Sequence, residues 1–238
     1  GMATMNGSVG WSDVGIFTPY RMWKLTGDRS ILLRHYEGMR AFAEFEISRC
    51  GPRFDIYSVY AKRVHMARAD KKYLVNSGQS YGEWAEPADV HPNDWKDSVA
   101  PHPEVSTAYT SYVLGLMAEI AEELGKRADA ERFSEYAKNC REAYISLRRT
   151  KEYPLETKRQ AELVRPLYME LFDEEDRKEA EKKLIRLLED YGWKLGTGFL
   201  STPLILYVLA DIDIEAASRL LENEEMPGWL YMPTNGAT

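Results

Sequence analysis

The chain has 238 residues, of which 44% are hydrophobic, and its 31 basic and 38 acidic residues give a net charge of -7. That length is enough for one domain with a substantial core, so we predict a single domain over residues 1–238. The basic residues are scattered rather than clustered, which argues against nucleic acid or an anionic membrane surface as the partner. A neutral partner fits this charge pattern better.

Targeting and metal-binding signals are also weak. No apolar run approaches the length of a membrane span, and residues 1–11 lack the basic region and apolar stretch of a signal peptide, so we expect a cytoplasmic protein with no membrane partner. Gly1 before Met2 is typical of a residue left by a purification tag. Neither the His residues nor Cys50 and Cys140 show zinc-ligand spacing, so we expect two free thiols, no metal site and no cofactor.

The first helical pair is marked by its end signals. An apolar stripe at helical spacing begins at Ser12–Asp13, where either residue can act as the N-cap, and stops at Gly27. Asp28 is placed to cap a second helix that ends before Gly51. Two helices joined by a tight Gly turn form an antiparallel hairpin.

The same pattern recurs three times further along the chain. The expected helix pairs are 105–125 with 128–147, 156–172 with 174–192, and 197–211 with 212–224. The repeating unit is therefore a helical hairpin. We predict an all-α fold of consecutive antiparallel hairpins stacked side by side.

The connections between hairpins are longer than the turns within them and are richer in Gly, Trp and acidic residues. Function is therefore expected on the face that carries these connections, where we place residues 10–13, 77–104, 153–160, 192–202 and 227–238. The longest connection, at about 52–104, is a candidate site loop, because loops of that length are uncommon in compact domains unless they are functional or disordered. Its aromatic content argues against disorder.

Within this connection, the segment 82–87 (GEWAEP) carries the strongest chemical signal. Glu83 and Glu86 flank Trp84, Gly permits a close approach, and Pro stiffens the exit. Carboxylates accept hydrogen bonds from sugar hydroxyls or exchange protons, and a flat ring covers the apolar face of a pyranose, so the segment is typical of a carbohydrate site. The structural alternative is a Trp that anchors the loop in the core beside solvated acids.

Other residues carry weaker signals. Trp11 beside Asp13 also fits a helix start, where an Asp cap often has a buried aromatic neighbour. His91, His102 and Trp95 are interpreted as loop-packing residues, because a lone His needs a placed partner before it acts as a general base.

Taken together, these segments resemble the catalytic domain of bacterial α-L-rhamnosidases, the family-78 glycoside hydrolases built on a six-hairpin (α/α) toroid. The resemblance rests on the order and spacing of GWSDVGIFTPYRMWKLTGDRSILLRHYEGMRAF, YGEWAEP, PEVSTAYTSY with IAEELGK, TGFLSTPLILYVLAD and MPGWLYMPTNGAT. It implies a glycoside hydrolase that acts on rhamnose-containing glycosides by inversion. It also implies that Trp11, Asp13 and Trp84 line the sugar pocket, together with Glu83, where the family commonly has Asp.

The resemblance further implies that the general acid precedes the segment that opens this chain and that the general base follows a tail like NGAT. We therefore expect both catalytic carboxylates to lie outside the chain, with Glu83 and Glu86 as weak local candidates. Four hairpins are expected here instead of six, which predicts a partial (α/α)6 toroid, truncated at both ends and inactive or weakly active. Its uncovered helix faces would favour a homo-oligomer.

Two other functions stay open. A catalytically dead carbohydrate-binding module would keep Trp11, Asp13 and Trp84 as its platform. A helical-hairpin scaffold would bind protein through its concave face, as helical repeat arrays do. The aromatic and acidic loops favour a sugar over a protein, since a protein-binding array would place its recognition residues on helices.

Overall fold

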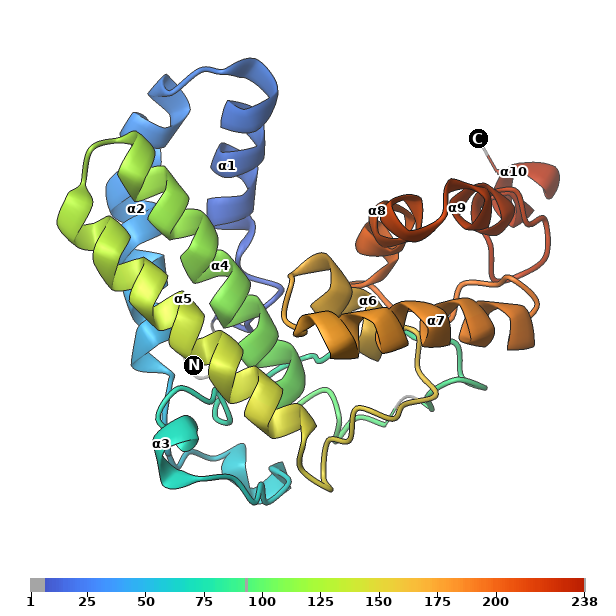
Figure 1. The fold of residues 1–238 in the computed structure, drawn as a ribbon, viewed down its shortest axis with the longest axis horizontal. Helices are drawn as coiled ribbons and strands as arrows, with labels where there is room; N and C mark the ends of the chain where they lie inside the picture. The colour runs from blue at the N-terminus through green and yellow to red at the C-terminus, as the bar shows by residue number, and fades with distance from the viewer. Residues whose placement is uncertain (1–6, 93, 238) are drawn as a thin grey trace. The chain divides into compact units, whose positions relative to one another are not determined.

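The computed structural model describes residues 7–92 and 94–237, and Figure 1 shows the fold. Over these two ranges every regular element is helical, which confirms the predicted all-α class. The chain divides into two compact units, one formed by Gly1–Gly82 with Lys96–Pro154 and the other by Glu83–Trp95 with Leu155–Thr238. Each unit contains its own helical hairpins.

The first unit contains two hairpins, α1 (Val14–Thr26) with α2 (Ser30–Ser48) and α4 (Pro103–Glu123) with α5 (Arg127–Arg148). Gly27 ends α1 in the left-handed conformation, with φ 72°, and its amide donates to the Trp23 carbonyl. Asp28 accepts hydrogen bonds at 2.8 Å from both the amide and the hydroxyl of Ser30. The predicted stop at Gly27 is therefore confirmed, whereas the N-cap position of α2 is Arg29 and Asp28 bonds to Ser30 from one position earlier.

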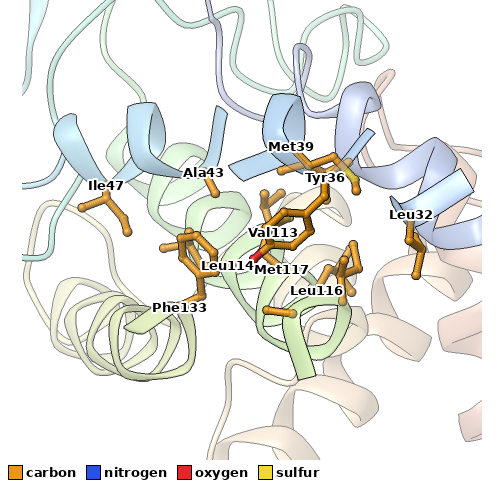
Figure 2. Close-up of a cluster of buried hydrophobic side chains, with 13 residues drawn as sticks. Leu32, Tyr36, Met39, Ala43, Ile47, Val113, Leu114, Leu116, Met117 and Phe133 are labelled. Atoms are coloured by element: carbon orange, nitrogen blue, oxygen red, sulfur yellow. The ribbon is translucent and has the colours of Figure 1, made fainter. Parts of the chain in front are cut away.

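An apolar core holds these helices together, and Figure 2 shows its side chains between α2, α4 and α5. The most deeply buried large side chains include Ile16, Tyr36, Met39, Met117 and Phe133, each at most 2% exposed. Burial of each such side chain contributes roughly 1.5–3 kcal/mol before the entropy of ordering is subtracted. The apolar stripes read from the sequence are thus the faces that join the two hairpins.

The long connection expected at 52–104 ends where α4 begins at Pro103, and its described residues before that point form only short helical turns, η2 (Ser58–Tyr60) and α3 (Arg68–Lys71). Its first part packs on α5 through a small apolar cluster of Val64, Leu74 and Leu147. The Val75 amide also donates to the hydroxyl of Thr107 in α4, at 3.0 Å. This part of the connection is therefore integrated into the first unit.

The second unit contains the helices α6 (Ala161–Tyr168), α7 (Glu174–Asp190), α8 (Thr202–Ile212), α9 (Ile214–Leu221) and α10 (Tyr231–Thr234). Helix α6 packs on α7 and on α8, and α8 packs on α9. Asp173 caps α7 by accepting from the Asp176 amide at 2.9 Å, and Asp213 caps α9 by accepting from the Glu215 amide at 2.9 Å. Asp213 is also the single residue between α8 and α9, so the predicted very short turn is confirmed.

Several expected boundaries in the second unit are wrong. The helix expected at 197–211 begins only at Thr202, where α8 starts. The helix expected at 156–172 is limited to Ala161–Tyr168, because Arg159 and Gln160 bond to other loops and Glu170 has a positive φ of 55°. The tail, expected to be a loop, contains α10. Among the described residues, none of the helices is long and apolar enough to cross a membrane.

Candidate functional site

The predicted site residues are distributed over both units. Trp11 and Asp13 belong to the first unit, whereas Glu83 and Trp84 belong to the second. Their convergence on one sugar stays a prediction. Within each unit the contacts of these side chains define what each residue does.

Trp11 lies in the turn that leads into α1 and is partly buried. Its indole Nε1 donates to the Gly82 carbonyl at 3.1 Å, and its ring meets the Tyr81 ring edge to face, with centroids 5.4 Å apart. These contacts use both the polar and the apolar part of the side chain. Trp11 is therefore fixed against the segment that leads to Glu83.

Asp13 is fully buried at the start of α1. Its Oδ2 accepts from the Gly10 amide at 2.9 Å, while Oδ1 has no hydrogen-bond partner among the described residues. Burial raises the pKa of Asp13 to about 7, although the Gly10 hydrogen bond and the Arg49 charge lower it. The carboxyl of Asp13 therefore positions the turn that carries Trp11.

A second buried acid, Glu46 of α2, interacts electrostatically with Asp13. Its Oε2 accepts from the Thr110 hydroxyl at 3.0 Å, and its Oε1 is buried with no hydrogen-bond partner in the described chain. Burial raises the pKa of Glu46, and the neighbouring Asp13 charge raises it further. Two acids in this environment cannot both ionise without a large penalty.

In the second unit, Glu83 is a buried anchor for a neighbouring loop. Its carboxylate forms an ion pair with Arg165, and both side chains are 1% exposed. It also accepts from the Gly198 amide at 3.1 Å and from the Ser201 amide and hydroxyl, both at 2.8 Å. Burial raises the pKa of Glu83, while the Arg165 charge opposes that shift. The carboxylate is thus occupied by protein donors.

The backbone after Glu83 is strained in a way that presents an aromatic ring. Trp84 and Ala85 have positive φ values of 41° and 59°, which side-chain-bearing residues adopt at an energetic penalty. A Cβ on Gly198 would lie 2.1 Å from the Trp84 carbonyl oxygen, so only Gly fits there. The Phe199 amide then donates to that same oxygen at 3.0 Å.

The product of this local geometry is an exposed pair of rings. Trp84 and Phe199 stack with centroids 5.7 Å apart and an interplanar angle of 28°, and they are 46% and 59% exposed. We call these two residues the aromatic platform. A solvent-facing ring pair held by a buried ion pair is suited to cover the apolar face of a ligand.

Glu86, the other acid of the segment, is also paired. Arg159 donates its Nε to Glu86 Oε1 at 3.0 Å and a terminal nitrogen to Oε2, and the Glu86 side chain is 1% exposed. Arg159 donates in addition to Glu162 at 3.0 Å. This bidentate contact fixes the loop after the aromatic platform.

Four of the five segments predicted to carry function contact one another within the second unit. The Arg159 pair joins segment 153–160 to the 83–87 loop. Gln160 accepts from the Gly196 amide at 2.9 Å, which joins that segment to 192–202. The Leu195 amide donates to the Pro227 carbonyl at 2.9 Å, which adds the tail. The placement of the fifth segment, 10–13, with this group stays a prediction.

A cavity of about 630 Å³ opens among these loops and begins at Ala85, the residue after Trp84. Its polar lining residues are Asp89, Asp190, Tyr191, Lys194, Thr197 and Thr202. The Tyr191 hydroxyl donates to Asp89 at 3.1 Å, and Lys194 pairs with Glu225 at 2.7 Å. Apolar walls with a few oriented hydroxyls and charges are typical of a small-molecule site.

Several supporting residues of this site are absent from the sequence prediction. A buried ion pair at Arg165 could be predicted from the sequence, because a charged residue between the apolar Val164 and Pro166 on a buried helix requires a partner. The roles of Phe199 and Ser201 could not be predicted, since each residue acts through a contact with a residue more than a hundred positions earlier. Among the described residues, His, Cys, Asp and Glu side chains do not gather in groups of three that could hold a metal.

Comparison with known proteins gives a consistent family. The model of the bacterial alpha-L-rhamnosidase 6 hairpin glycosidase domain matches residues 1–238. Curated alpha-L-rhamnosidases from Streptomyces avermitilis and Formosa agariphila are each 28% identical over 98% of this chain. The chain spans 20% and 23% of the lengths of these two relatives.

Solved structures agree with that match. The Streptomyces avermitilis alpha-L-rhamnosidase complexed with L-rhamnose superposes with a TM-score of 0.73 and 27% identity, covering 97% of this chain and 19% of that one. The alpha-L-rhamnosidase from Dictyoglumus thermophilum, at 24% identity over 97% of this chain and 24% of its own, has a TM-score of 0.73 and supports the fold. The chain belongs to the bacterial α-L-rhamnosidase six-hairpin glycosidase domain family.

Proposed function

We propose that this chain supplies sugar-binding structure to an α-L-rhamnosidase, an inverting glycoside hydrolase that acts on rhamnose-containing glycosides. The observation that carries the proposal is the aromatic platform, in which Trp84 and Phe199 stack and are 46% and 59% exposed. A 6-deoxy sugar needs apolar walls for its methyl group and oriented acceptors for its hydroxyls. Family membership supports the hydrolase class.

The proposed roles follow from the contacts. Trp84 stacks on the sugar and Phe199 supports its ring, while Glu83 with Arg165 holds the loop that carries both. The cavity that starts at Ala85 would receive the part of the glycoside that extends beyond the platform. Contact of Trp11 with a sugar stays a prediction, and Asp13 fixes the turn that carries Trp11.

Proton transfer by the acids of the GEWAEP segment is disfavoured by their pairing. Glu83 is occupied by Arg165, Gly198 and Ser201, and Glu86 is occupied by Arg159. We therefore propose that this segment binds and positions, so that the chain alone binds rhamnosides better than it cleaves them. A catalytically dead carbohydrate-binding module is the second candidate, and the pairing of both acids favours it. The protein-binding scaffold has weaker support, since the exposed rings lie in loops.

The test is a titration with L-rhamnose followed by saturation-transfer NMR, which reads the sugar and not the Trp residues. Binding near the millimolar range is expected, corresponding to about -4 kcal/mol. Trp84→Ala and Phe199→Ala should each weaken it about 2- to 10-fold, because one ring contact contributes about 0.5 to 1.5 kcal/mol. Tyr207→Ala is the matched control, as Tyr207 is 60% exposed and pairs with Tyr168 elsewhere in the same unit. Equal binding in all four proteins would reject the platform.

We also propose that the chain self-associates through the outer face of α1. Val14, Met22 and Leu25 on that helix are 62%, 44% and 85% exposed. Exposed apolar side chains on one helix favour burial against another surface. Light scattering should give a mass above that of the monomer, and Leu25→Glu should lower it; a monomeric parent would reject this proposal.

A further inference from the structure

The two cysteines of the chain meet inside the first unit. Their Sγ atoms are 3.9 Å apart although the residues are 90 positions apart in the sequence. Cys50 follows Arg49 at the C-terminal end of α2, and Cys140 lies in the interior of α5. Both are free thiols, and the chain contains two cysteines, so one pairing within the chain exists.

The two thiols have different environments. Cys140 is fully buried, whereas Cys50 is partly exposed. The hydrogen bond from Cys140 lowers the pKa of Cys50, and the Arg53 charge lowers it further against the effect of burial. The same hydrogen bond and burial raise the pKa of Cys140. The thiolate therefore forms on the accessible sulfur and the thiol stays on the buried one, which is the arrangement of a reactive cysteine with a resolving partner.

We propose that Cys50 and Cys140 are a reversible redox modification site, which hydroperoxides convert into an intramolecular disulfide between α2 and α5. The Cys50 thiolate attacks the O–O bond of hydrogen peroxide, an S–O bond forms, and hydroxide leaves to give a sulfenic acid. The Cys140 sulfur then attacks Cys50, the S–S bond forms, the S–O bond breaks, and water leaves. Overall, two thiols are oxidised and one peroxide is reduced to two waters.

The geometry needs only a small adjustment for the second step. The sulfur atoms must approach by roughly 2 Å to reach bonding distance, which rotation about the Cα–Cβ bonds can supply. Cys50 Sγ also contacts the Glu46 carbonyl at 3.8 Å. Its distance of 3.9 Å from Cys140 Sγ shows that it points toward α5. Two small side chains packed as inert apolar groups are the alternative.

The first measurement oxidises the whole 238-residue chain with a small excess of hydrogen peroxide, then denatures and alkylates it with iodoacetamide. We expect a monomer on a non-reducing gel, a mass lower by two hydrogen atoms, and no alkylation; dithiothreitol should restore two alkylated thiols. Two alkylated thiols after peroxide, a disulfide-linked dimer, or a sulfinic acid on Cys50 would each overturn the proposal.

Single variants separate the roles of the two sulfurs. Cys140→Ser should stop at the sulfenic acid on Cys50, which dimedone traps, because the resolving thiol is gone. Cys50→Ser keeps the buried thiol and should resist oxidation under the same conditions. Oxidation of Cys50→Ser as fast as the parent would show that Cys50 is not the attacking residue. Because Cys50 is partly exposed, we expect Cys50→Ser to fold. It therefore still tests the proposal if Cys140→Ser does not fold.

Discussion

Arg165 and Glu83 form an ion pair in which each side chain is only 1% exposed, and Glu83 immediately precedes the ring of the aromatic platform. The sequence predicts Glu83 as a sugar ligand and, more weakly, as a catalyst. The contacts favour a positioning role instead, because Gly198 and Ser201 fill the remaining acceptor sites of the carboxylate.

Glu83→Gln is expected to destabilise the second unit by about 3–5 kcal/mol, because it leaves the Arg165 charge buried without a counter-charge. Adding Arg165→Met should recover part of that loss, since the buried charge is then removed. Urea denaturation of the single and double variants measures this coupling. Glu174→Gln is the control, because the exposed pair of Glu174 with Lys178 should change stability by less than about 0.5 kcal/mol. A double variant less stable than Glu83→Gln would show that the buried Arg165 charge is not what destabilises the single variant.

The stability of the first unit is expected to fall as pH rises from about 4 to about 7. Asp13 has an ordinary pKa of 3.8 in the unfolded chain, and burial raises its pKa to about 7 in the folded one. Between these values the folded state binds more protons than the unfolded state, so the free energy of unfolding decreases with pH, by up to about 1.4 kcal/mol per pH unit. The raised pKa of Glu46 acts in the same direction.

Asp13→Asn should flatten this pH dependence and be more stable than the parent at pH values above 7, since no charge has to be buried. Surface acids with lowered pKa values, such as Asp129 beside Tyr36, lose their stabilising effect only as the pH falls below the window. Urea midpoints measured between about pH 4 and about pH 7 test whether the stability of the first unit falls as the pH rises. A parent whose stability rises between the two limits, or an Asn variant that keeps the full slope, would contradict it.

Gly198→Ala is expected to weaken both stability and sugar binding. Its Cβ would meet the Trp84 carbonyl oxygen at 2.1 Å, so the loop must move and the Phe199 stack must open. Gly115→Ala in α4 is the matched control, because nothing lies within 4 Å of its Cβ position and Ala favours the helix by about 1 kcal/mol. Thermal melting and the L-rhamnose titration should show losses for Gly198→Ala alone; equal behaviour of the two variants would reject the close approach.

The hairpins could be predicted because their signals are local. Gly27 stops α1 through its own backbone conformation, and Asp213 caps α9 through a neighbour two residues away. The supporting contacts of the site could not be predicted, because the partners of Glu83 are distant in the sequence. Arg165 lies 82 positions after it and Ser201 lies 118 positions after it. The predicted start of α6 is wrong for the same reason, since Arg159 and Gln160 bond with residues of distant loops and lie outside the helix. Periodicity has no information about such partners.

Glu86→Gln is expected to leave any turnover of an aryl α-L-rhamnoside within about tenfold of the parent rate, because Glu86 is held by Arg159 and does not transfer a proton. Conversely, a loss of turnover of about 100- to 10,000-fold in Glu86→Gln relative to the parent would assign Glu86 as the general acid or base. Circular dichroism is the control that the loop variant is folded.

The most direct test is a crystal structure of the chain with L-rhamnose at a concentration well above its dissociation constant. We expect one apolar face of the sugar on the Trp84 ring, with Phe199 behind it and with Glu83 still bonded to Arg165 and Ser201. Sugar bound away from this ring, or an ordered crystal with no sugar at the platform under saturating conditions, would show that the aromatic platform is not the sugar-binding element of this chain.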